Sequence, residues 1–254
     1  FYGGERSLIT INMSEYQESH SVSLLRGSPP GYVGYGSGGV LTEAVKRQPY
    51  SVLLLDEVEK AHPDVLEVFF QIFDKGIMDD GEGQEVDFKN TIILLTSNAC
   101  SGDISEAFGV DDHADIEDVV HAIRPKLHKV FQPAFLGRLT IIPYKPISDL
   151  VLTEIVKSKL YIIERRLLAS HSINLKYDSK VIDCLVGKSH SVDIGARAID
   201  NVMNTLVVPV ISELVLESMA NRKIISEITV RYDSESNFIF EVTHKNVGPD
   251  SSSL

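Results

Sequence analysis

One stretch decides the fold: Ser51-Val52-Leu53-Leu54-Leu55-Asp56-Glu57-Val58. Its uninterrupted apolar run is short for a helix and predicts a strand that is buried on both faces, as in a parallel sheet. The run ends in two adjacent carboxylates, Asp56 and Glu57. They fit the acidic first turn of a helix, where the macrodipole favours Asp and Glu, and they equally fit a functional site. The stretch by itself leaves both explanations open.

The second explanation has a specific chemistry. A buried strand that ends in Asp-Glu has the form of a Walker B motif, in which the Asp holds Mg²⁺ and the Glu polarises the water that attacks the γ-phosphate of ATP. On this interpretation Asp56 is the metal residue and Glu57 is the catalytic base. The rest of the chain has to decide between the two explanations.

Composition limits the class of protein. The chain has 254 residues, of which 43% are hydrophobic, and this is enough for a main domain and a smaller one. No apolar run approaches the roughly 20 residues of a membrane helix. The net charge of −12 argues against broad binding to nucleic acid, which depends on Lys and Arg. Cys100 and Cys184 form no disulfide framework and lack metal-ligand spacing, so we expect a cytoplasmic protein without membrane or nucleic-acid partners.

Strands and helices alternate along residues 1–145, which is typical of an α/β protein with a parallel sheet and flanking helices. The predicted strands are 7–13, 51–56, 91–98 and 139–143, and the predicted helices are 41–47, 63–75 and one that ends near 130. Polar residues stand where strands end, with Asp56 after one and Asn98 after another. Open α/β sheets bind ligands at this edge.

The pattern changes near residues 143–146, and a smaller, mostly helical domain is predicted from there. The predicted helices are 149–170, 179–186 and 195–220, and the predicted strands are 173–176, 224–232 and 238–243, the last two as a hairpin. Pro209 should kink or divide the third helix. The predicted domains are therefore 1–145 and 146–245, followed by a disordered tail at 246–254.

A loop is predicted at residues 27–39, which read Gly-Ser-Pro-Pro-Gly-Tyr-Val-Gly-Tyr-Gly-Ser-Gly-Gly. Its glycines and prolines exclude a helix or a central strand. A structural loop and a phosphate cradle are both possible explanations, but the stretch contains no Lys to reach a phosphate. An exposed Tyr32-Val33 pair between glycines instead suits contact with an apolar and variable partner.

Taken in order, these features resemble the second ATPase domain of the Clp-type AAA+ unfoldases, close to the ClpB disaggregase, over roughly residues 1 to 245. The motifs that carry the resemblance are Gly31-Tyr32-Val33-Gly34, the 51–58 stretch, Glu59-Lys60-Ala61-His62-Pro63, Asp80-Gly81-Glu82-Gly83, Thr96-Ser97-Asn98, Phe135-Leu136-Gly137-Arg138 and Gly195-Ala196-Arg197. Within this family, residues 131–138 and 195–200 are most similar to ClpV, the ATPase of type VI secretion, because ClpB-like chains usually have Asn at the position of Gly137.

The resemblance implies an AAA+ α/β domain with a small lid domain, ATP and Mg²⁺ as ligands, and a homohexamer. Asp56 would hold the metal and Glu57 would be the catalytic base. Asn98 resembles sensor 1, which orients the attacking water, and Arg197 resembles sensor 2, which reaches the phosphates. Arg138 resembles the arginine finger, which serves the ATP of the neighbouring subunit.

Three of these residues also have an ordinary explanation. Asn98 follows a strand, and Asn is common in such turns. Arg197 stands near a predicted helix start, where an Arg is usually a solvated charge that the macrodipole mildly disfavours. Arg138 fits a surface salt bridge of little stabilising value.

The resemblance also implies a substrate channel. Tyr32 and Val33 resemble the pore loop that contacts a translocating polypeptide, and the turn at 79–83 resembles the second pore loop. An aromatic grip responds to bulk rather than to sequence, so nearly any extended chain can be pulled.

One motif of the family is missing from these residues. No stretch fits the phosphate loop Gly-x-x-x-x-Gly-Lys-[Ser/Thr], and Gly187-Lys188-Ser189 is better explained as the end of a helix. The family has this loop just before a segment like residues 1–5, so we expect the sequence to start after it, by a cut or an omission. The 254 residues alone are then expected to bind ATP poorly, and micromolar affinity would contradict this.

The predicted function is the C-terminal ATPase module of a hexameric unfoldase that threads polypeptide through a central pore, with the contracted sheath of a type VI secretion system as its substrate. A general disaggregase of the ClpB type is the alternative among enzymes. An inactive assembly or substrate-binding module is the alternative of another class, because the phosphate loop is missing.

Overall fold

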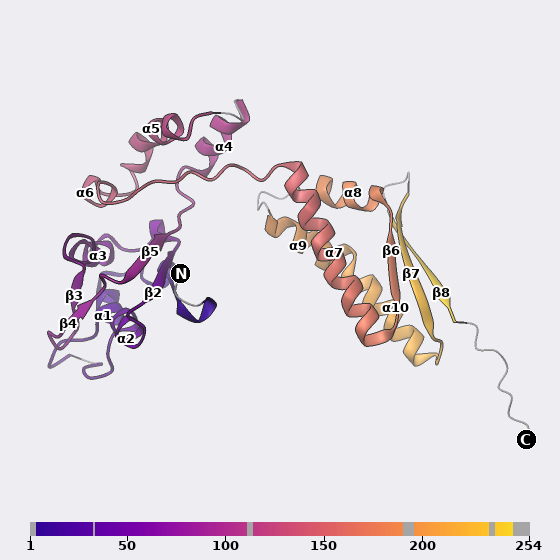
Figure 1. Ribbon diagram of the computed structural model, residues 1–254, viewed down its shortest axis with the longest axis horizontal. Coiled ribbons are helices and arrows are strands. Elements are labelled where there is room, and N and C mark those ends of the chain that lie inside the picture. Colours follow the sequence, from indigo (N-terminus) through magenta and orange to yellow (C-terminus); the bar gives the residue numbers. More distant parts are fainter. Residues whose placement is uncertain (1–3, 33, 111–113, 190–195, 234–236, 246–254) are drawn as a thin grey trace, which may run out of the picture. The chain divides into compact units, whose positions relative to one another are not determined.

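The chain divides into two compact units, Phe1–Lys145 and Pro146–Leu254, in a computed structural model (Figure 1). The structure describes residues 4–32, 34–110, 114–189, 196–233 and 237–245. Each unit has its own hydrophobic core.

The first unit is built on a parallel sheet whose central strand contains the apolar run at residues 52–55. Strand β2 (Ser51–Asp56) lies between β1 (Leu8–Asn12) and β5 (Thr91–Leu95), and both neighbours run parallel to it. Leu53 and Leu55, on one face of β2, are fully buried, while Val52 and Leu54 on the other face are half-buried. The α/β class and the parallel strand are therefore confirmed, and burial on both faces is confirmed only in part.

Helices and a short hairpin complete the first unit. The helices are α1 (Val22–Arg26), α2 (Val40–Arg47), α3 (Pro63–Lys75), α4 (Ser101–Val110), α5 (Ile116–Leu127) and α6 (Pro133–Leu136), and the hairpin pairs β3 (Ile77–Asp79) with β4 (Glu85–Asp87). Helix α3 has the predicted bounds because its ends are well defined. Pro63 opens it, His62 accepts a hydrogen bond from the Asp64 amide at 3.2 Å, and Gly76 ends it in the left-handed conformation.

One predicted strand of the first unit is wrong, and helix α4 was missed. Residues 139–143 are not a strand, because they form no ladder with a neighbouring strand. Leu139 and Ile141 pack against the core while Thr140 and Ile142 are exposed, so burial alone produces the alternating pattern. Helix α4 was not predicted, since its apolar residues lack a clear helical stripe.

The second unit combines helices with a three-stranded sheet. Its elements are α7 (Asp149–His171), β6 (Asn174–Tyr177), α8 (Ser179–Ser189), α9 (Ala196–Leu206), α10 (Val208–Ala220), β7 (Ile225–Tyr232) and β8 (Phe238–His244). Strands β7 and β8 form the predicted antiparallel hairpin, and β6 pairs with β7 in parallel (Figure 1). The division of the third predicted helix is also confirmed, because α10 begins at Val208 with Pro209 in its first turn.

Helices α9 and α10 together form the one stretch, Ala196–Ala220, that is long and apolar enough by composition to cross a membrane, among the residues that the structure describes. The stretch is broken at Val207, which is fully buried, and Ile199, Ile211 and Val215 pack into the core of the second unit. Its apolar character is therefore accounted for by core packing.

The predicted tail at 246–254 lies outside the described residues.

Candidate active site at the ends of β2 and β5

The first feature of the site is the contact between the ends of two parallel strands. Asp56 is the last residue of β2, and Thr96 directly follows β5. The Thr96 hydroxyl donates a hydrogen bond to Oδ1 of Asp56, and the Thr96 amide donates to the Leu55 carbonyl at 2.9 Å. This contact orients the Asp56 carboxylate at the carboxyl edge of the sheet, where parallel sheets bind ligands.

Glu57 has an unusual backbone. Its φ of 57° and ψ of 47° lie in the left-handed region, which costs about 1–3 kcal/mol for a residue that is not glycine. Thr96 stabilises this turn, because its hydroxyl accepts from the Glu57 amide at 3.2 Å and its carbonyl accepts from the Val58 amide at 3.0 Å. Such strain is concentrated at functional sites, where it aims a side chain.

The Glu57 carboxylate is paired within its own turn. Lys60 donates to Oε2 of Glu57 at 2.8 Å, and this hydrogen bond holds the pKa of Lys60 above its ordinary value. Both side chains are partly exposed, so the pair is a weak one that can open. The Glu57 carboxylate is therefore accessible, with Lys60 as its neighbour in the same turn.

Asn98 is fixed by its backbone rather than by its side chain. The Asn98 amide donates to Oε1 of Glu59 at 3.2 Å, while the residue is exposed. Glu59 lies in a short helix, Val58–Lys60, that follows Glu57. Its contact with Asn98 therefore connects the ends of β2 and β5 a second time. The structure thus brings Asp56, Glu57 and Asn98 to one edge of the sheet.

Arg138 lies elsewhere in the first unit, in the turn after α6. Its guanidinium forms two parallel hydrogen bonds with Asp74, at 2.7 and 2.8 Å, and donates to the Ala134 carbonyl at 2.6 Å. It also lies 5.0 Å from the ring centre of Phe70. The hydrogen bond from Arg138 holds the pKa of Asp74 below its usual range. Arg138 and Asp74 therefore form the surface salt bridge of the ordinary explanation, in a bidentate geometry.

The remaining predicted residues fall in other places. Arg197 is an exposed residue in the first turn of α9, in the second unit. Tyr32 is 70% exposed in the glycine-rich loop, between Gly31 and Gly34, whose φ values of 91° and 90° favour glycine. Val33 lies outside the described residues.

The sequence does not single out two residues that hold the site. Thr96 and Glu59 stand inside family motifs without a predicted role, although they fix Asp56, Glu57 and Asn98. The parallel pairing gives a signal for Thr96, because the residue after β5 must lie beside the last residue of β2 once the two strands are in register.

Metal binding at this edge would depend on few protein ligands. Among the residues that the structure describes, no group of three His, Cys, Asp or Glu side chains is placed to hold a metal ion. Mg²⁺ at phosphate-binding sites usually takes one or two carboxylates, together with phosphate oxygens and waters. The single Asp56 carboxylate, oriented by Thr96, fits this kind of site.

Comparison with known families agrees with this geometry. The family described as AAA domain (Cdc48 subfamily) matches residues 1–142, and the C-terminal, D2-small domain of ClpB protein matches residues 147–230. The chain belongs to the Clp-type AAA+ family. Within that family it is a second ATPase domain of the ClpB and ClpV kind, which confirms the resemblance seen in the sequence.

Curated relatives give the same answer over most of the chain. The chain is 55% identical to the chaperone protein ClpB of Yersinia enterocolitica over 216 residues, which are 85% of this chain and 24% of the relative. It is 49% identical to the AAA+ ATPase ClpV1 of Pseudomonas aeruginosa over 230 residues, or 90% of this chain and 26% of the relative. The chain thus spans about a quarter of the length of these Clp-type relatives.

Proposed function

We propose that this chain is the C-terminal ATPase module of a hexameric, ATP-driven unfoldase. The observation that carries the proposal is the pair Asp56 and Glu57 at the carboxyl end of β2, fixed by Thr96 at the end of β5. The second relative supports it, since its name describes an AAA+ ATPase. The alternative of an inactive module is less well supported, because Thr96 holds the strained Glu57 backbone at the sheet edge where parallel sheets bind ligands.

Each predicted site residue would have a different role in ATP hydrolysis. Mg²⁺, when bound, would neutralise charge on the ATP phosphates, and Asp56 would hold it there. Glu57 would leave Lys60, contact the attacking water and accept its proton. Asn98, whose backbone is fixed by Glu59, would orient that water. Arg197 would reach the phosphates of the same subunit, and Arg138 those of a neighbouring subunit.

The glycine-rich loop supports the threading of a polypeptide. The Tyr32 and Tyr35 side chains are 70% and 53% exposed, and neither belongs to a hydrophobic core among the described residues. In a hexamer the loops, including Val33, would line a central pore, with the turn at 79–83 as a second lining element. Exposed aromatic rings bind extended polypeptide through apolar surface that nearly every sequence offers.

For the substrate we propose the contracted sheath of a type VI secretion system. The 49% identity to ClpV1 and the similarity to ClpV at residues 131–138 support this choice. The second candidate is general disaggregation, because a relative of 55% identity carries the name chaperone protein ClpB. In either case we expect a cytoplasmic protein that acts on polypeptide rather than on nucleic acid or membrane.

An experiment with two substrates separates these candidates. The full-length protein and ATP are added either to contracted sheath tubules or to a heat-aggregated enzyme, and loss of sedimenting material is measured. We expect rapid loss of the tubules and little loss of the aggregate. Clearance of the aggregate alone would assign the ClpB-type function instead.

Tyr32→Ala tests the pore loop. We expect ATP hydrolysis by the full-length protein to remain and unfolding of a tightly folded reporter to be lost, because the grip on the polypeptide disappears while the ATP site stays intact. Tyr32→Phe is the matched control, and it should keep unfolding since the aromatic ring remains. Normal unfolding by Tyr32→Ala would reject a role of Tyr32 in gripping the substrate.

A further inference from the structure

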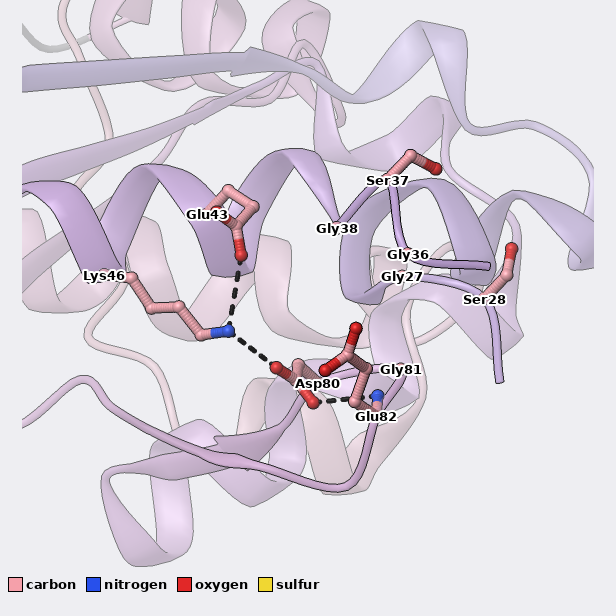
Figure 2. A pocket seen from close by; sticks show the side chains of 10 residues that line it. All are labelled: Gly27, Ser28, Gly36, Ser37, Gly38, Glu43, Lys46, Asp80, Gly81 and Glu82. Atoms are coloured by element: carbon pink, nitrogen blue, oxygen red, sulfur yellow. Dashed lines mark hydrogen bonds and ion pairs between the residues drawn. The ribbon is translucent and has the colours of Figure 1, made fainter. Parts of the chain in front are cut away.

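Two loops that are far apart in the sequence meet in the first unit. The Gly81 amide, in the turn between β3 and β4, donates to the Arg26 carbonyl at the root of the glycine-rich loop at 3.0 Å. The backbones touch so closely that a Cβ on Gly81 would lie 2.5 Å from the carbonyl carbon of Gly27. Figure 2 shows the two segments side by side around a small polar pocket.

Asp80 lies at this junction and is a buried charged residue, only 6% exposed. Its Oδ1 accepts hydrogen bonds from the amides of Glu82 at 2.9 Å and Gln84 at 2.8 Å. Its Oδ2 accepts from Lys46 of α2 at 2.6 Å. One oxygen therefore closes the turn, and the other fastens the turn to a different element.

Burial alone would raise the pKa of the Asp80 carboxyl. The hydrogen bonds from Lys46 and from the two amides outweigh burial, and the pKa lies below its ordinary value. Asp80 is thus ionised at neutral pH, and Lys46 is its charged partner.

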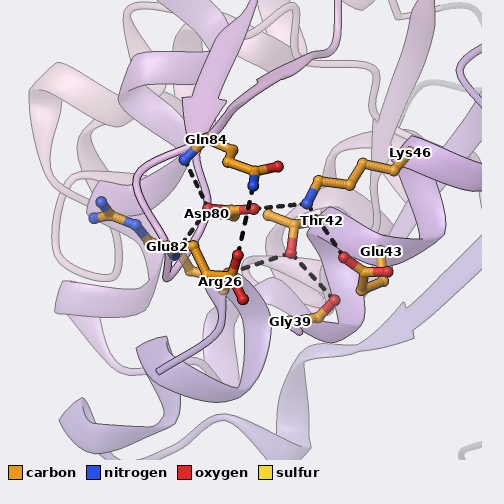
Figure 3. Close-up of polar contacts among 8 residues, drawn as sticks. All are labelled: Arg26, Gly39, Thr42, Glu43, Lys46, Asp80, Glu82 and Gln84. Atoms are coloured by element: carbon orange, nitrogen blue, oxygen red, sulfur yellow. Dashed lines mark hydrogen bonds and ion pairs between the residues drawn. The ribbon is translucent and has the colours of Figure 1, made fainter. Parts of the chain in front are cut away.

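Helix α2 also holds the glycine-rich loop. Thr42 donates its hydroxyl hydrogen toward the carbonyls of Arg26, just before the loop, and Gly39, its last residue, each 3.2 Å away. Gly39 itself packs against the Arg26–Gly27 backbone, where a Cβ would lie 2.3 Å from the Arg26 carbonyl carbon. In Figure 3, Thr42 and Lys46 extend from the same helix, one toward the loop and the other toward Asp80.

These contacts make a three-part junction of α2, the root of the loop and the turn. Closing the turn would need only the amide contacts of Asp80, which a neutral Asn can also make. The ion pair with Lys46 adds a connection between elements, and burying a charge for it is costly. The buried ion pair between Asp80 and Lys46 is explained if the two loops must keep a fixed spacing.

We propose that Asp80 is a positioning residue that, through Lys46, locks the turn at 79–83 to the root of the 27–39 loop, so that the two loops move as one body. The proposal rests on the proposed function, because a shared motion matters if both loops line a pore. Tyr32 would then be displaced together with the second loop in each step of threading, with α2 as the connecting element.

Amide hydrogen exchange of the full-length protein tests the lock without relying on unfolding activity. Asp80→Asn keeps an oxygen for the Glu82 and Gln84 amides and removes the charge that pairs with Lys46. We expect exchange in peptides that cover residues 27–39 and 79–83 to become about tenfold faster. Unchanged exchange in both peptides would overturn the proposal.

Lys46→Met provides a second variant that keeps the fold testable, since the Lys46 side chain is partly exposed at 32%. It should accelerate exchange as Asp80→Asn does, and the double variant should add little, because both changes remove the same interaction. Glu43→Gln is the matched control, since Glu43 contacts the same Lys46 nitrogen at 3.3 Å from a partly exposed position. Strictly additive effects of the two variants, or an equal effect of Glu43→Gln, would reject the lock.

A functional measurement completes the test. In the full-length Lys46→Met variant we expect ATP turnover within about twofold of the unmodified protein and unfolding of a folded reporter reduced about tenfold, because the loops no longer move together. Unfolding at the normal rate, with exchange accelerated, would show that the lock does not position the loops for threading. If the unmodified protein unfolds nothing, the proposed function fails, while the exchange result still decides whether the lock exists.

Discussion

Glu57→Gln in the full-length protein is expected to lower ATP turnover in this ring by a factor of about 100 to 10,000, the usual contribution of a general base. Gln has the same shape as Glu and can still accept the hydrogen bond from Lys60. It cannot accept a proton from water. The contact between Thr96 and Asp56 does not involve the Glu57 side chain, so binding of ATP should remain.

Two measurements check this result on the same preparation. Nucleotide affinity is measured by titration with a fluorescent ATP analogue, and turnover is measured by phosphate release. Glu117→Gln is a suitable control, because it makes the same chemical change at an exposed carboxylate on α5, outside the segments 56–59 and 96–98. Turnover that stays normal in Glu57→Gln would refute the Walker B assignment.

Arg138→Ala is expected to lower ATP turnover about 1,000-fold or more, as loss of an arginine finger does. The contact with Asp74 makes a sharper comparison possible. If Arg138 served only as the partner of Asp74, then Asp74→Asn would have the same effect as Arg138→Ala. A finger must leave Asp74 to reach ATP, so Asp74→Asn should keep turnover near normal.

Mixed rings show whether Arg138 acts on the ATP of its own subunit or on the ATP of the neighbouring subunit. Neither Arg138→Ala nor Glu57→Gln subunits should hydrolyse ATP alone. In a mixture, an intact Glu57 in one subunit can meet an intact Arg138 from its neighbour, and part of the turnover should return. A mixture as inactive as its components would place Arg138 in its own subunit and reject the finger.

Much of the fold could be predicted because it depends on local patterns. The apolar run of β2 fixes a buried strand, and Pro63 and Gly76 fix the ends of α3. The failure at residues 139–143 has a different origin. Alternating burial of Leu139 and Ile141 indicates contact with a core, but a strand also needs a neighbour to pair with, and pairing is not a local property.

The candidate site was predictable in its identities and less so in its contacts. Asp56, Glu57 and Asn98 follow from the strand ends and the family motifs. The pairing of Arg138 with Asp74 and of Lys46 with Asp80 joins residues 64 and 34 positions apart, which no periodicity encodes. The left-handed turn at Glu57 was also missed, because Glu has no preference for that conformation and the contacts of Thr96 stabilise it.

We propose that hydrolysis at Asp56 and Glu57 drives the threading of polypeptide. The most direct test follows the fluorescence of a stable folded reporter, together with phosphate release, for the full-length protein. We expect fluorescence to fall with ATP and to stay constant both with a nonhydrolysable ATP analogue and in Glu57→Gln with ATP. Equal loss of fluorescence with the analogue would contradict the proposal.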